Sequence, residues 1–149
     1  LGIGVVLPLL GAAAQGAAAA LRWEWLVPPF LAGVAGHWVT SIPDELADRR
    51  ARKRTLAVVA GGLVARRAAL ALVTFAALSG WWMLPGDDRA RAWALALVLA
   101  ATLPAWAVHH DAGPTDRRRC LIFVAALGGA ITAAFVGWSV AAAMTAHVD

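Results

Sequence analysis

The chain has 149 residues, of which 61% are hydrophobic and only 15% are charged, and its formal net charge is +4. Its mean hydropathy of +0.70 and isoelectric point near 11.0 exclude an ordinary soluble domain and are typical of a polytopic membrane protein. A nucleic-acid-binding role is disfavoured, because the basic residues lie in short gaps between apolar runs rather than across a polar surface. The single cysteine, Cys120, excludes an internal disulfide and a cysteine-rich zinc site.

Five apolar segments are long enough to cross a bilayer, which takes about 17–25 residues. In chain order they are Leu1–Leu21, Trp25–Ile42, Ala68–Leu84, Ala92–Val108 and Cys120–Met144. Abundant small residues suit close helix packing in lipid, and tryptophans near several segment ends are typical of interfacial anchors. We therefore predict an all-α fold, a polytopic transmembrane helical bundle that forms one membrane domain over residues 1–149.

The first segment is apolar from Leu1 onward and has neither the basic stretch nor the cleavage site of a signal peptide. We therefore expect it to be a membrane span rather than a leader. We also expect the chain to be a piece of a longer protein that lacks an N-terminal part.

The connections between segments differ in charge. Those at Asp44–Arg67 and His109–Arg119 fall on the same side of the predicted bundle and hold ten of the thirteen lysines and arginines. The other side holds Arg22, Arg89 and Arg91. Because cytoplasmic loops carry the excess of Lys and Arg, we expect an integral, multi-pass membrane protein with the Asp44–Arg67 connection on the cytoplasmic side.

That connection begins with two carboxylates four residues apart, Asp44 and Asp48. On a helix they share one face, and two neighbouring carboxylates repel each other unless a cation such as Mg²⁺ lies between them. The basic residues Arg49, Lys53 and Arg54 could donate to phosphate oxygens on such a cation. An acidic pair in a basic loop is weak evidence by itself, since a solvated loop of mixed charge has the same composition.

Further residues flank this pair. His37 and Ser41 continue nearly the same helical face toward the bilayer, and Pro43 is expected to bend the helix between them and the pair. The apolar stretch Thr55–Ala60, closed by two glycines, is too short to span and is expected to lie at the interface as a short helix over the site. Arg66 and Arg67 start the third span and are expected either to snorkel or to face the site.

A second polar group, His109-His110-Asp111, has the residue types of a metal site. It lies at a helix end beside Gly113-Pro114, where a plain interfacial loop is the better interpretation.

The longer pattern, Asp-x-x-x-Asp-Arg-x-x-x-Lys-Arg-Thr-Leu over residues 44–56, resembles the second aspartate-rich motif of the UbiA superfamily of intramembrane prenyltransferases. The resemblance implies that the five spans belong to the C-terminal half of a nine-helix fold. Three features depart from the family pattern: the first motif, of the Asn-Asp-x-x-Asp type, is absent, Ser41 stands where many members have an acidic or polar ligand, and Arg52 replaces the usual glycine.

The resemblance also implies a function. Asp44 and Asp48 would be the catalytic metal ligands, holding Mg²⁺ against the diphosphate of a polyprenyl donor, and Arg49, Lys53, Arg54, Ser41 and His37 would line the diphosphate site. A prenyl group would pass to an acceptor, expected to be aromatic as in the biosynthesis of quinones and related lipids. The fragment alone is expected to be inactive without the missing N-terminal half. The alternatives are a terpene-cyclising or inactive relative of the same fold and a non-enzymatic transport or assembly protein of the membrane.

Overall fold

The computed structural model describes residues 22–83, 87–113 and 115–145. The elements, in order, are η2 (Trp23–Leu26), α2 (Val27–Ser41), α3 (Glu45–Arg50), α4 (Leu56–Ala60), α5 (Gly62–Met83), α6 (Asp88–Val108) and α7 (Arg117–Thr145). The described part of the chain is mostly helical and contains no strand, which confirms the all-α prediction for these residues.

Three helices are long and apolar enough to cross a membrane, over Gly62–Met83, Arg91–Val108 and Arg117–Trp138. They match the last three predicted spans. The predicted first span, Leu1–Leu21, lies outside the described residues, so it stays a prediction.

The predicted second span divides into a 3₁₀ turn and a short helix. Prolines in the first turn of α2 fit a helix start. The N–H groups of a first turn have no partner within the helix, so a proline, which has no N–H, loses no hydrogen bond there. The helix then ends at Ser41 after 15 residues. Helix α2 alone is shorter than the about 17 residues that a span takes, but η2 continues directly into it, so the crossing predicted for Trp25–Ile42 stays a prediction.

The third span also begins earlier than predicted. Helix α5 starts at Gly62 rather than at Ala68, because the φ of +88° at Gly61 ends α4 and turns the chain directly into the next helix. Few residues other than glycine adopt this backbone conformation. The early start places Arg66 and Arg67 inside the helix.

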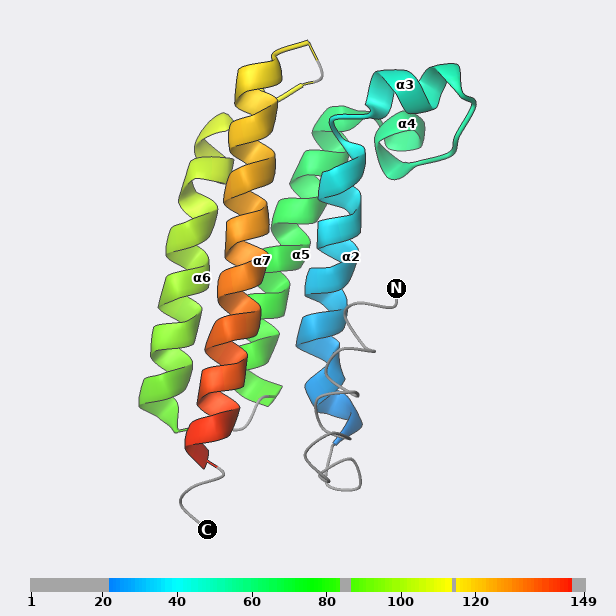
Figure 1. Cartoon of the computed structure of the whole chain (residues 1–149). Helices are drawn as coiled ribbons and strands as arrows, with labels where there is room; N and C mark the ends of the chain where they lie inside the picture. Colours follow the sequence, from blue (N-terminus) through cyan, green and yellow to red (C-terminus); the bar gives the residue numbers. More distant parts are fainter. Residues whose placement is uncertain (1–21, 84–86, 114, 146–149) are drawn as a thin grey trace.

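Helices α2, α5, α6 and α7 lie side by side as an elongated bundle (Figure 1). The most extensive packing is between α6 and α7, followed by α2 against α5, α5 against α6, and α2 against α7. At one point α6 and α7 come very close: a Cβ on Gly137 would lie 3.1 Å from the Cβ of Ala94. Small residues at such crossings permit the close helix packing expected in lipid.

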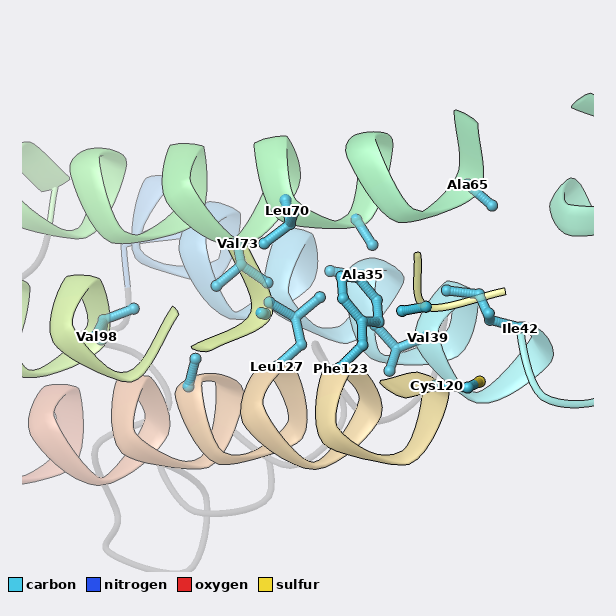
Figure 2. Close-up of a cluster of buried hydrophobic side chains, with 14 of the residues drawn as sticks. Ala35, Val39, Ile42, Ala65, Leu70, Val73, Val98, Cys120, Phe123 and Leu127 are labelled. Carbon is cyan, nitrogen blue, oxygen red and sulfur yellow. The ribbon is translucent and has the colours of Figure 1, made fainter. Parts of the chain in front are cut away.

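Small side chains also fill the bundle interior. Nine of the seventeen residues in the described core cluster are alanines. The largest fully buried side chain there is Phe123 of α7, which lies between Val39 of α2 and Leu127 of its own helix in Figure 2. Large apolar residues such as Trp82, Trp93 and Leu103 are instead highly exposed, the pattern of helices whose outer faces meet lipid.

Helices α3 and α4 lie at one end of the bundle, and the α6–α7 connection lies at the same end (Figure 1). Helix α4 packs against α5 and α2, and α3 packs against α4. The two basic connections of the sequence, at Asp44–Arg67 and His109–Arg119, therefore meet at one end of the described bundle, as predicted from the alternation of spans.

Candidate functional site

The acidic pair lies on the short helix α3. Asp44 is the residue before its first turn, and the Asp48 amide donates a hydrogen bond to the Asp44 carbonyl oxygen at 2.8 Å. The two carboxylates are therefore one helical turn apart, which is the spacing that the sequence predicts. Their environments differ, because Asp44 is exposed whereas Asp48 is only 6% exposed.

The polar face predicted to run from His37 to Asp48 is not one continuous helix. Helix α2 ends at Ser41 and α3 begins at Glu45, because the segment around Pro43 forms a turn. The Ser41 hydroxyl donates to the Trp38 carbonyl at 2.7 Å, a local bond within its own helix. His37 is exposed. No described contact joins His37 or Ser41 to the acidic pair. Their membership of the site stays a prediction.

Helix α3 ends in a tight reversal. The Lys53 amide donates to the Asp48 carbonyl at 2.9 Å, and the Arg52 amide donates to the Arg49 carbonyl at 3.2 Å. These are the two bonds of a Schellman motif, in which the residue at the turn takes a left-handed conformation. Here that residue is Arg52, with a φ of +55°. Glycine adopts this backbone conformation more readily than arginine does.

This reversal brings Lys53 back onto the acidic pair. Its Nζ lies 2.9 Å from an Asp48 carboxylate oxygen. A hydrogen bond from the ammonium to Asp48, with the charges of Asp48 and Asp44, raises the pKa of Lys53 above its ordinary value of 10.5. Lys53 is the one lysine among the 149 residues, and the chain has no tyrosine.

A third carboxylate, Glu45, belongs to the same helix and was missed in the sequence analysis. It is 7% exposed, and its carboxylate accepts a hydrogen bond from Arg49 at 3.1 Å. Arg49 is thus paired with Glu45, whereas Arg54 is exposed. Only the i, i+4 spacing of Glu45 and Arg49 was available to signal this pair from the sequence.

The α6–α7 connection lies near this helix and holds the predicted His-His-Asp group. His109 is 9% exposed, and its ring Nδ1 lies 2.6 Å from the Trp106 carbonyl oxygen. Asp111 is exposed and forms an ion pair with Arg119. No group of three or more His, Cys, Asp or Glu side chains is placed to hold a metal ion anywhere in the described ranges. The interpretation as an interfacial loop stays a prediction.

Arg66 connects the two regions. Its guanidinium donates to the carbonyl oxygens of His109, Ala112 and His110, at 2.6, 3.1 and 3.3 Å. Arg66 is 4% exposed, whereas its neighbour Arg67 is exposed. Of the two predicted alternatives for Arg66, snorkelling is therefore wrong: the side chain turns inward to the loop.

Comparison with known proteins finds no relative of this chain. The chain matches no family model, no curated protein and no solved structure. Inferences about its function therefore rest on the residues of this end of the bundle.

Proposed function

We propose that this chain is part of a Mg²⁺-dependent prenyltransferase similar to the UbiA superfamily, which transfers a prenyl group from a polyprenyl diphosphate to an aromatic acceptor. The observation that carries the proposal is the arrangement of α3: two carboxylates one turn apart, with Lys53 folded back onto Asp48, at an end of a bundle of apolar helices. A carboxylate pair beside exposed basic groups suits a divalent cation that carries a diphosphate.

The donor set fits magnesium. This ion usually binds through one or two carboxylates, retains several waters and takes further oxygens from a substrate phosphate. Asp44 is exposed and makes no capping bond to α3, so its oxygens face solvent. Asp44 and Asp48 are the residues that would hold the ion. When bound, Mg²⁺ would stabilise the negative charge of the diphosphate leaving group.

The basic side chains would supply the remaining charge. Lys53 and Arg54 are exposed and come directly after the turn that ends α3, so they can donate to diphosphate oxygens beside the acidic pair. Lys53 shares an oxygen of Asp48 with any cation that binds there. Diphosphate binding would thus be accompanied by movement of the Lys53 ammonium away from Asp48 toward the phosphate.

A site at the membrane surface suits such a substrate. The isoprenoid tail partitions into the bilayer while the diphosphate stays in water, so the reacting carbon lies near the interface. The excess of basic residues at this end supports placing it on the cytoplasmic side of the membrane.

Lys53, the one lysine of these 149 residues, allows a direct test in the intact protein. An amine-reactive reagent, with site-resolved mass spectrometry, would measure the modification rate of Lys53 with and without Mg²⁺ plus farnesyl thiodiphosphate. We expect Mg²⁺-dependent binding of the analogue and a changed Lys53 rate. Binding should weaken at least about a hundredfold in Asp44→Asn and Asp48→Asn. The matched control is Asp111→Asn, an exposed acid of the other connection at the same end. Equal binding in EDTA and in Mg²⁺ would overturn the proposal.

A non-enzymatic membrane protein is the second candidate. It is favoured by the pairing already present, since Glu45 binds Arg49 and Asp48 binds Lys53 without any ligand. In that case the charges would only set topology, and neither Mg²⁺ nor the analogue would alter the Lys53 rate. A terpene-cyclising relative would bind the analogue but yield a cyclised hydrocarbon from farnesyl diphosphate without any acceptor.

A further inference from the structure

Arg66 is a buried cation that the proposed chemistry does not use. It lies in the second turn of α5, and all three of its guanidinium nitrogens donate to backbone carbonyls of residues 109–112. These carbonyls follow the last turn of α6, where no further helical amide is available to pair with them. The planar fork of arginine matches several acceptors at once, which a lysine ammonium on one stem cannot do in the same geometry.

Glu45 approaches Arg66 from the other side. A Cβ placed on Gly62 would lie 2.5 Å from Glu45 Oε2 and 3.1 Å from Arg66 Nη1. Both charged groups therefore converge over the first residue of α5, in the space that the missing side chain leaves. Because Glu45 is in the first turn of α3, this approach brings the acidic helix beside the first turns of α5.

Arg66 lies where three elements come together. Glu45 of α3 approaches Arg66 of α5 over Gly62, and Arg66 donates hydrogen bonds to the backbone of the α6–α7 connection. Helix α3 packs mainly on the five-residue helix α4, which by itself is a weak support. A short helix of six residues has little stability of its own and depends on such contacts.

We propose that Arg66 is a positioning residue, which couples α3 to the α6–α7 connection and thereby fixes Asp44 and Asp48 relative to the bundle. The effect on catalysis rests on the proposed function, whereas the structural coupling does not. Arg66 touches neither carboxylate of the pair in any described hydrogen bond, so it acts through Glu45 and the loop.

The coupling is tested by amide hydrogen exchange of the intact protein in lipid nanodiscs. Arg66→Lys keeps the charge but loses the fork, and Gly62→Ala adds a methyl group between the two side chains. In both variants we expect exchange to quicken about tenfold or more over residues 45–50, and in Arg66→Lys over residues 109–112 as well. Arg67→Lys, at the exposed neighbouring position, is the matched control and should change neither segment. Faster exchange in residues 109–112 alone would show that Arg66 only caps the loop, and would overturn the proposal.

A second measurement separates positioning from general destabilisation. We expect Arg66→Lys to raise the Mg²⁺ concentration needed for half-maximal analogue binding about tenfold, at an unchanged yield of folded protein. A normal Mg²⁺ response that is seen only when residue 66 is arginine would support positioning. A lower yield with an unchanged Mg²⁺ response would contradict it. If the intact protein binds no analogue at all, the proposed function fails, and hydrogen exchange still decides the coupling.

Discussion

The two connections at the basic end of the bundle both place acidic residues next to basic ones, but they bury different groups. In the α2–α5 connection, residues 42–61, the carboxylates of Glu45 and Asp48 are buried and the basic side chains around them are exposed. In the α6–α7 connection, which follows α6 from His109, the acidic side chains are exposed and paired with Arg119. Its buried polar groups are the His109 side chain and the backbone carbonyls that Arg66 binds. The first connection therefore holds side-chain ligands in place, and the second supplies anchoring points for Arg66. Burial, rather than local charge composition, distinguishes a candidate site from a solvated loop.

The largest expected effect on stability comes from replacing the arginine that binds the buried carbonyls, and it is compared with replacing the arginine that pairs with the exposed acids. Arg66→Met leaves three buried or partly buried carbonyls without their donor and is expected to lower the free energy of unfolding by about 3 kcal/mol. Arg119→Met removes only ion pairs of exposed groups and should lower it by less than about 1 kcal/mol. Reversible unfolding in mixed micelles measures both values. Equal losses would show that the two connections do not differ in the way their burial indicates.

A smaller effect is expected at the reversal that ends α3. Arg52 holds a left-handed conformation, which disfavours any residue with a Cβ, so Arg52→Gly should stabilise the protein by about 0.5–1 kcal/mol. Unfolding in the same micelles measures the change, and Arg50→Gly, within α3, serves as the control that should destabilise. A loss of stability in Arg52→Gly would contradict the assignment of the turn.

The smallest effect concerns the ion pair of Lys53 and Asp48. Because the folded protein raises the pKa of Lys53 above its ordinary value of 10.5, the contribution of the pair is fully present below that pH and is lost as the pH rises through the raised value. The stability difference between the native protein and Lys53→Met should therefore shrink in alkaline solution. Since Lys53 is exposed, the difference should also shrink at high salt. A difference that stays constant up to pH 12 would contradict the pairing.

Hydropathy predicted much of the helical bundle, but it did not predict most of the contacts at the candidate site. The three long helices were predictable because an apolar run of about 20 residues has few alternatives in a membrane protein. Their boundaries were less predictable: Gly61 and Gly62 suggested the end of a short helix, but not that the next one starts at once. The spacing of Asp44 and Asp48 was visible in the sequence because it depends on one local turn.

Burial of charged residues depends on distant parts of the chain. Nothing within ten residues of Arg66 shows that it pairs with carbonyls more than forty positions away. Likewise, Glu45 resembles its neighbours in sequence, and only the approach of α5 at Gly62 makes it different. Such contacts arise from tertiary packing, for which a single sequence carries no periodic signal.

The alanine-rich interior has a consequence for how this bundle can vary. Where neighbouring helices are separated by methyl groups, as at Ala65, Ala69 and Ala134, the side chains act as fixed spacers between backbones. Truncation at these positions removes little, whereas any enlargement pushes two helices apart along their length. At the basic end, α5 and the start of α7 bring the two connections together. The distance between these helices, and with it the geometry of that end, is therefore set by unreactive alanine side chains.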